Sequence, residues 1–213
     1  MQDEYWHQKW AKNDIGFHKA EANPLLTQHF ESLNAAKGDR IFVPLCGKSL
    51  DIAWLLSNGY RVAGAELSRT AIEQLFEGLK LTPTITPARN LTLFQAENID
   101  IFVGNLFDLS AADLRPVHCI YDRAAMVALP AEIRLKYARL LAEITGHARQ
   151  LLLTYAYDQD LAKGPPFSVV DEEVRGHYEA SYRLSHLAKI ELPKGIKGQV
   201  DATETVWLLE PRP

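Results

Sequence analysis

The stretch IFVPLCGKSLDIAWLLSNGYRVAGAELS, residues 41–68, contains the pattern that decides the fold. An apolar run at 41–44 is followed by a helical pattern at 49–57, and the asparagine–glycine pair behind it is typical of a helix C-terminus. A second apolar run occupies 61–67, and Ser68 is a favourable N-cap for another helix. Strand, helix and strand in this order predict a parallel pair of strands joined by a crossover helix.

The same alternation continues along the chain. Further strands are predicted at 92–95, 99–103, 117–121, 150–157, 182–192 and 205–210, and further helices at 69–79, 130–146 and 171–180. Only the loop 193–202 separates the last two strands, which should be antiparallel because a parallel pair needs a longer crossover. Residues 1–35 are expected to form an N-terminal helical lid. We predict a single α/β domain over 1–213, with a mostly parallel sheet and helices on both faces.

The composition is that of a soluble globular protein, with 47% hydrophobic and 23% charged residues and a net charge of −4. An acidic surface does not attract nucleic acid or anionic membranes, which argues against both as partners. We expect a small-molecule partner and a monomer. The start of the chain lacks the apolar stretch of a signal peptide, which predicts a cytoplasmic location. Cys46 and Cys119 lie in apolar runs and should be buried and reduced, and no cysteine–histidine spacing predicts a metal site.

The loop PLCGKS, residues 44–49, should lie at the ligand-binding edge of the sheet. It resembles the end of a phosphate-binding loop, but Phe42 stands where that motif needs a glycine. The dinucleotide motif needs three glycines, and this loop has only Gly47. Two interpretations remain: Gly47 lets a ligand without phosphate come close, or it simply makes the turn.

An acidic residue ends the second predicted strand. Glu66 follows Gly47 by 19 positions, where a carboxylate can accept both hydroxyls of a ribose. The alternative is a solvated glutamate at a strand end. A glycine turn, a ribose-binding acid and the lack of a phosphate site together predict adenosine without a diphosphate, and S-adenosylmethionine is such a ligand.

Three other segments are candidates for the site. Asp122 and Arg123 follow the strand 117–121 directly, although they could form an ordinary surface pair. Trp10 and Phe17 could cover a planar ligand, and a tryptophan over a sulfonium would gain about 1–2 kcal/mol; the alternative is simple helix packing. The loop GPPF at 164–167 is stiff and places an aromatic residue at the same edge of the sheet; the alternative is an ordinary connecting loop.

Six stretches carry a resemblance to a known family: YWHQKW (5–10), IGFH (15–18), VPLCGKSLD (43–51), GAELS (64–68), YDRAA (121–125) and GPPFSV (164–169). In sequence and in order they resemble the thiopurine S-methyltransferase family of bacterial type. The resemblance implies a Rossmann-like methyltransferase fold, with a seven-stranded, mostly parallel sheet and an antiparallel last strand. It also implies methyl transfer from S-adenosylmethionine to the sulfur of a small aromatic or heterocyclic thiol. Reduced selenium and tellurium compounds are additional candidate acceptors.

The resemblance assigns roles to individual residues. The cofactor-binding residues are expected to be Trp10, Leu45, Gly47, Glu66, Leu67, Asn105, Leu106 and Arg123. The substrate should be bordered by Phe17, Pro166 and Arg123, with Lys194 or Lys197 in place of an arginine that the family often has before the last strand.

The reaction expected is an in-line displacement by a thiol or thiolate, in which the protein supplies position and excludes water. Aromatic thiols are acidic enough to need no dedicated base. Asp122 is the nearest candidate, either to orient Arg123 or to help remove a proton, so the two form the expected catalytic pair. Two rival functions are a nicotinamide-dependent oxidoreductase, which lacks its glycine-rich turn here, and a non-enzymatic S-adenosylmethionine-binding module, which has less need for an aromatic lid.

Overall fold

The computed structural model describes residues 3–12, 21–196 and 198–212. It divides into two compact units, residues 2–119 and 120–213, which are described separately. The expectation of one domain over the whole chain stays a prediction.

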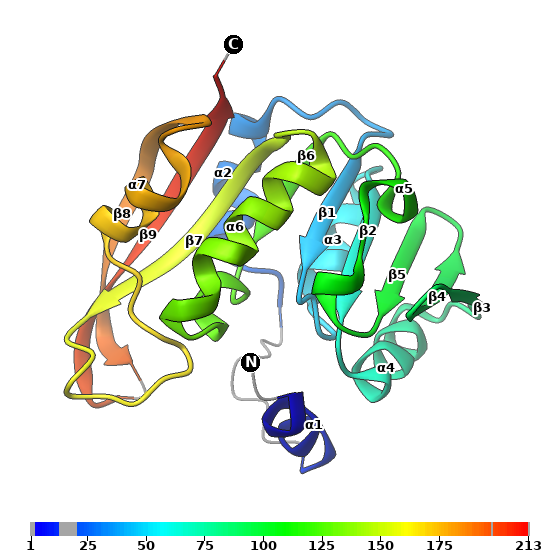
Figure 1. The fold of residues 1–213 in the computed structure, drawn as a ribbon, viewed down its shortest axis with the longest axis horizontal. Coiled ribbons are helices and arrows are strands. Elements are labelled where there is room, and N and C mark those ends of the chain that lie inside the picture. The colour runs from blue at the N-terminus through cyan, green and yellow to red at the C-terminus, as the bar shows by residue number, and fades with distance from the viewer. Residues whose placement is uncertain (1–2, 13–20, 197, 213) are drawn as a thin grey trace. The chain divides into compact units, whose positions relative to one another are not determined.

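The first unit is built on three parallel strands (Figure 1). β1 (Arg40–Pro44) pairs with β2 (Arg61–Glu66), and β2 pairs with β5 (Ile99–Val103). β3 (Thr84–Ala88) and β4 (Leu91–Ala96) continue the sheet in antiparallel pairing, in the order β3-β4-β5-β2-β1. The parallel pair predicted from residues 41–68 is therefore confirmed.

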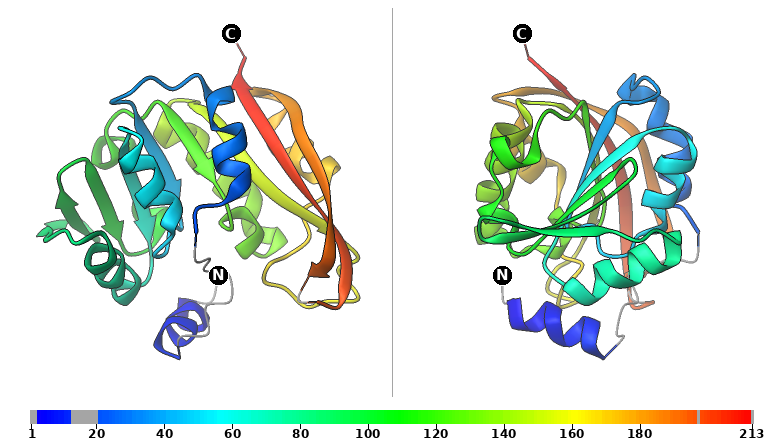
Figure 2. Two further views of the ribbon diagram at one scale, coloured as in Figure 1. Left: turned by 180° about the vertical axis from the view of Figure 1, so that it is seen from behind. Right: turned by 90° about the vertical axis from the view of Figure 1, so that its right-hand side faces the viewer.

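The first unit contains short helices besides the two predicted at 49–57 and 69–79, which are confirmed as α3 and α4. Its helices are α1 (Asp3–Ala11), α2 (Pro24–His29), η1 (Phe30–Leu33), α3 (Leu50–Ser57), α4 (Arg69–Leu79), η2 (Leu106–Asp108) and α5 (Ala111–Leu114). The hydroxyls of Ser49 and Ser68 cap α3 and α4 by accepting bonds from the amides of Asp51 and Ala71. α3 packs against β2, and α4 packs against β2 and β5 (Figure 2).

The second unit contains β6 (Cys119–Asp122), which begins at the unit boundary, η3 (Met126–Ala128), α6 (Ala131–Thr145), β7 (Arg149–Tyr157), α7 (Asp171–Tyr178), β8 (Tyr182–Ile196) and β9 (Val200–Pro211). Its strand order is β6-β7-β9-β8. β9 runs antiparallel to both β7 and β8, which confirms the predicted antiparallel end of the sheet. α6 has Pro130 at its N-cap and Gly146 in the left-handed region behind it, as a helix with these ends should.

Two predictions about the strands are wrong. The described residues contain nine strands instead of seven, and β3 was not predicted because most of its residues are exposed and it has no apolar run. The loop predicted at 193–202 is largely strand, since β8 continues to Ile196 and β9 starts at Val200. Ile196 pairs with Val200 across these strands, and the register shifts between Leu192 and Ile196, as at a β-bulge.

Each unit has its own apolar core. Phe42, Ile52 and Ile101 are fully buried in the first unit, and Leu151 and Trp207 in the second. Among the described residues no helix is long and apolar enough to span a membrane. Within the described part of the chain, no three histidine, cysteine or acidic side chains are grouped so that they could hold a metal ion.

Candidate functional site

The loop after β1 turns sharply at the carboxyl ends of the parallel strands. Leu45 has φ +45° and Gly47 has φ +51°, both in the left-handed region, which a bulky residue such as leucine seldom adopts. The amide of Cys46 donates to the carbonyl of Ala65 at 3.0 Å and ties the loop to β2. The strained position is therefore held by pairing to the neighbouring strand.

Glu66 is buried and organises this loop. Its Oε2 accepts the amide of Gly47 at 2.9 Å, and its Oε1 accepts the amide of Ser68 at 2.8 Å. Burial raises the pKa of the Glu66 carboxyl, and amide bonds from Ser68, Gly47 and Leu67 counter part of that rise. The side chain is 7% exposed, so the alternative of a solvated strand-end glutamate is wrong.

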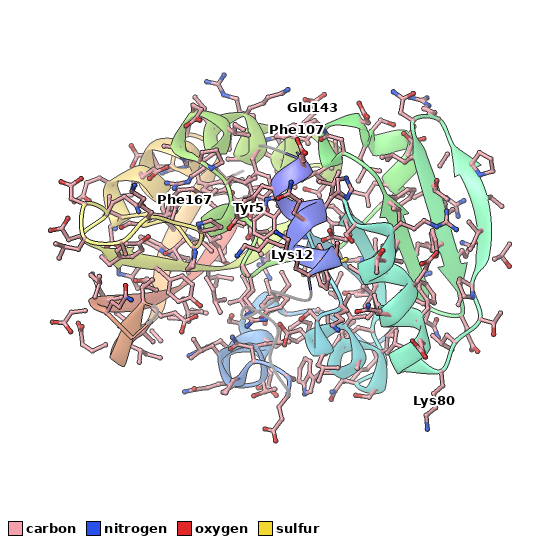
Figure 3. All side chains as sticks on the ribbon, turned by 90° about the horizontal axis from the view of Figure 1, so that it is seen from below. Tyr5, Lys12, Lys80, Phe107, Glu143 and Phe167 are labelled. Atoms are coloured by element: carbon pink, nitrogen blue, oxygen red, sulfur yellow. The ribbon has the colours of Figure 1, made fainter. Side chains whose placement is uncertain are left out.

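Trp10 of α1 lies directly against the same loop. A Cβ placed on Gly47 would lie 3.0 Å from Cζ2 of Trp10, tighter than ordinary contacts, and Trp10 is only 6% exposed. Two features therefore require a glycine at position 47: its positive φ, and the indole of Trp10, which leaves no room for a Cβ. α1 lies beside the carboxyl ends of β1 and β2 (Figures 1 and 2), and Figure 3 labels Tyr5 on this helix and Lys12 just beyond it.

Asn105 and Leu106 follow β5 at the same edge. The amide of Gly104 donates to the carbonyl of Glu66 at 2.9 Å, which joins the ends of β2 and β5. Asn105 caps η2 by accepting the amide of Phe107 at 3.0 Å, and Leu106 is buried. The structure therefore brings Trp10, Gly47 and Glu66 together and links Asn105 to them through the backbone; Leu45 and Leu67, both half-buried, flank the turn.

The hydrogen bonds at the carboxyl ends of β1 and β2 suit S-adenosylmethionine better than a ligand with a phosphate group. The amides of Gly47 and Ser68, which a pyrophosphate would need as donors, already bond to the carboxylate of Glu66. A carboxylate beside them would also repel a phosphate. A carboxylate offers about four lone pairs, so Glu66 can accept a hydroxyl in addition to these amide bonds. The residues present fit a cationic adenosine compound.

Asp122, in the second unit, is turned into the core. Its Oδ2 accepts the hydroxyl of Tyr137 at 2.7 Å and the side-chain amide of Gln150 at 3.3 Å, and its Oδ1 accepts the amide of Met126 at 3.2 Å. Burial raises the pKa of the Asp122 carboxyl to about 6, while the bonds from Tyr137 and Met126 work in the opposite direction. It is fully buried, so the surface-pair alternative is wrong for this residue. Its part in the reaction stays a prediction.

Arg123 is half-buried and precedes Ala124, whose φ is +58°. Burial raises the pKa of the Tyr155 phenol in β7, and the positive charge of Arg123 lowers it. Sequence reasoning missed Tyr155 and its partner Glu204, which lies directly opposite it in β9. A glutamate inside the apolar run of β9 is the signal that could have found them, since a buried acid in a strand needs a partner.

Pro166 lies in a loop that is fixed from several sides. Its carbonyl accepts the hydroxyl of Tyr157 at 2.6 Å, and the next amide, of Phe167, donates to Val127 at 2.6 Å. Arg134 reinforces the loop by donating to the carbonyl of Ser168. A cleft of about 620 Å³ adjoins this loop and is lined among others by Pro130, Arg134, Tyr157, Gly164, Phe167 and Glu173; Figure 3 labels Phe167.

Two of the expected substrate residues lie outside what the structure describes. Phe17 and the predicted turn around Gly16 fall within residues 13–20, and Lys197 is likewise outside the described residues. The backbone of Lys194 belongs to β8, but its side chain is not described. The predicted roles of Phe17, Pro166, Lys194 and Arg123 stay predictions.

Comparisons with known proteins point to one family. The family model of thiopurine S-methyltransferase matches residues 1–210. Thiopurine S-methyltransferases from Teredinibacter turnerae and Xanthobacter autotrophicus are each 49% identical to this chain; the first match covers 98% of this chain and 97% of that protein, and the second covers 99% of each.

Solved structures of low identity show the same fold. A 1,6-didemethyltoxoflavin-N1-methyltransferase from Burkholderia thailandensis, crystallised with S-adenosylhomocysteine, is 12% identical, with a TM-score of 0.63 and coverage of 99% of this chain and 87% of that one. A TehB-like methyltransferase from Corynebacterium glutamicum gives a TM-score of 0.59 at 13% identity, covering 99% and 98%. The Rossmann-like methyltransferase fold expected from the sequence is confirmed. The chain belongs to the thiopurine S-methyltransferase family and is an S-adenosylmethionine-dependent S-methyltransferase.

Proposed function

We propose that this enzyme methylates the sulfur of a small aromatic or heterocyclic thiol, thiopurines being the model, and that it also accepts small selenium or tellurium compounds. The observation that carries the proposal is the buried carboxylate of Glu66, which binds the loop amides of Gly47 and Ser68. That arrangement supports a cationic adenosine ligand and opposes a phosphorylated one. It also argues against the nicotinamide-dependent alternative, and family membership argues against a non-enzymatic module.

The protein's part in the reaction is binding, orientation and exclusion of water. S-adenosylmethionine, when bound, supplies a methyl group on a positively charged sulfur. Glu66 would accept the two ribose hydroxyls with its remaining lone pairs, and Leu67, Asn105 and Leu106 would border the adenine. Trp10, against Gly47, would exclude water from this edge.

The acceptor side is proposed to involve Arg123, Pro166, Phe17 and Lys194. A guanidinium stabilises a thiolate by lowering the pKa of the thiol next to it. No dedicated base is then needed for an aromatic thiol. Asp122, whose oxygens bond to Tyr137, Gln150 and Met126, would act by fixing the segment that carries Arg123.

The experiment that tests the function is a screen for S-adenosylhomocysteine formation with benzenethiol, a thiopurine, a selenol and tellurite as acceptors. We expect product with both thiols. If no thiol gives S-adenosylhomocysteine, the proposal that thiols are the acceptors is wrong. In a binding arm, calorimetry should give micromolar affinity for S-adenosylhomocysteine, with no competition by NADH or ATP; tight binding of NADH alone would restore the oxidoreductase alternative.

We further propose that the N-terminal segment, residues 1–35, acts as a lid. Trp10 lies on the loop that binds the cofactor, so ligand binding and the position of α1 should be coupled. S-adenosylhomocysteine should slow cleavage by trypsin after Lys9 and Lys12. Equal cleavage rates with and without the ligand would refute a lid.

A further inference from the structure

Arg134 is a buried cation beside the loop that carries Pro166. It lies near the start of α6, and only 3% of its side chain is exposed. Its Nε donates to the carbonyl of Leu129 at 2.8 Å, and its Nη1 donates to the carbonyl of Ser168 at 3.0 Å. One planar guanidinium therefore joins the chain just before α6 to the chain just before α7.

Glu173 of α7 balances the charge of this guanidinium. Both of its carboxylate oxygens lie 2.8 Å from Nη1 of Arg134, and Oε1 lies 3.2 Å from Nε2 of His177, one turn further along α7. Burial raises the pKa of the Glu173 carboxyl, but the hydrogen bonds with His177 and Arg134 outweigh this, so the pKa is lowered and the carboxylate is charged at neutral pH. The ion pair thus ties α6 to α7, the helix that follows the loop.

The ring of Phe167 packs against the same guanidinium. The Cζ of Arg134 is 5.7 Å from the centre of the ring, a cation–π distance. Gly164 also lies against this ring, since a Cβ placed there would be 2.6 Å from Cγ of Phe167. Together with the bond to Ser168, these contacts place residues 164–168, which Figure 3 marks by the label of Phe167, relative to Arg134.

Open space borders the loop on one side. The cleft of about 620 Å³ is lined by Arg134, Phe167 and Glu173 among others. On that side the position of the loop depends on hydrogen bonds and on the ion pair rather than on close packing. A loop that loses the bond from Arg134 therefore has room to move.

We propose that Arg134 is a positioning residue for the acceptor, because it fixes the loop in which Pro166 stands. This inference rests on the proposed function, in which Pro166 borders the acceptor. The role requires geometry as well as charge, since a lysine at position 134 would keep the charge opposite Glu173 but lose the fork that holds two carbonyls. A displacement of about 1 Å in a group that positions the substrate can slow a reaction about 100-fold.

The test measures kinetics with benzenethiol at saturating S-adenosylmethionine. Arg134→Met keeps an unbranched side chain and removes every donor, so KM for benzenethiol should rise about tenfold, the change expected for loss of one charge-assisted hydrogen bond. Arg134→Lys should give a smaller rise because the charge remains. A merely structural role would reduce the amount of folded enzyme and so lower the apparent kcat, but would leave KM unchanged. Calorimetry should give the wild-type affinity for S-adenosylhomocysteine in both variants.

Trypsin reports on the loop without any substrate. Lys163 is exposed at the start of the loop, and cleavage after it should be faster in Arg134→Met than in the wild type. Arg139→Met is the matched control, since this arginine lies on the same helix but is exposed, and its loss should change neither KM nor the cleavage rate.

A second variant disturbs the loop while Arg134 is intact. In Gly164→Ala the new Cβ must displace the ring of Phe167, so KM for benzenethiol should rise here as well. If Arg134→Met does not fold, Arg134→Lys and Gly164→Ala decide the matter, and an unchanged KM in both would overturn the positioning role.

The outcomes separate this inference from the function on which it rests. No S-adenosylhomocysteine from the wild type with any thiol would overturn the proposed function itself. An active wild type, with KM for benzenethiol unchanged in Arg134→Met and Arg134→Lys, would overturn only the role of Arg134.

Discussion

The amide of Gly47 donates a 2.9 Å hydrogen bond to Oε2 of Glu66, so the residue expected to hold the ribose also holds the loop beneath it. A second bond, from the amide of Ser68 to Oε1, fixes the start of α4 to the same carboxylate. The side chain of Glu66 is therefore expected to contribute both to cofactor binding and to the stability of the loop after β1.

Glu66→Ala should weaken both. Removal of a charged hydrogen-bond partner should reduce the affinity for S-adenosylhomocysteine by about 1–3 kcal/mol, and the two amides left without an acceptor should reduce the free energy of unfolding by a similar amount. Glu66→Gln keeps one acceptor oxygen and should lose less stability. Calorimetry and urea unfolding measure the two effects, and unchanged affinity in both variants would mean that the ribose lies elsewhere.

Gly47→Ala should destabilise the loop for two separable reasons. The φ of +51° is unfavourable for alanine by about 1–2 kcal/mol, and the new Cβ would press against Cζ2 of Trp10 at 3.0 Å. In a double-mutant cycle with Trp10→Ala, the steric part should disappear and the backbone part should remain. Strict additivity of the two unfolding free energies would show that the indole does not press on this position.

Asp122 should make stability depend on pH. Its carboxyl has a pKa of about 6 in the fold against an ordinary value of 3.8, and two pKa units correspond to about 3 kcal/mol. Because the folded state binds this proton more tightly, the stabilisation is full below about pH 4 and is lost as the pH rises through about 6. The free energy of unfolding of the wild type should thus fall over this range relative to Asp122→Asn. Parallel pH curves for the two proteins would contradict the raised pKa.

Arg123→Lys keeps the charge but loses the planar set of donors, and Arg123→Ala loses both. We expect partial activity in the lysine variant and a larger loss in the alanine variant, mainly in kcat/KM for the acceptor. The pH at which turnover rises should move upward in Arg123→Ala, because the thiolate loses a stabilising cation. Wild-type kinetics in both variants with several aromatic thiols would leave Arg123 without a role in acceptor binding.

Local sequence signals predicted the elements that position the cofactor site. Ser68 caps α4 as expected, Gly146 follows α6, and Gly47 and Glu66 lie at adjacent strand ends because parallel strands present their carboxyl ends at one edge. These features depend on residues close together in sequence or on the regular geometry of a parallel sheet.

Other features depend on contacts that no local pattern encodes. β3 is exposed along most of its length and exists through its pairing with β4, so it has no apolar periodicity to detect. The opposition of Tyr155 and Glu204 depends on the register between β7 and β9. The burial of Asp122 likewise depends on Tyr137 from α6 and Gln150 from β7.

The burial of the two cysteines bears on redox chemistry. Cys46 and Cys119 are both buried, and the Sγ of Cys46 lies 3.0 Å from where a Cβ on Gly64 would be. Burial, together with the carboxylate of Glu66, raises the pKa of the Cys46 thiol well above its ordinary value. Since only a thiolate attacks a disulfide, Cys46 is a poor partner for thiol–disulfide exchange. On the proposed thiol specificity, Cys46 should therefore resist forming a mixed disulfide with an oxidised substrate, and the mass of the peptide that contains it should stay unchanged in oxidised thiol solutions.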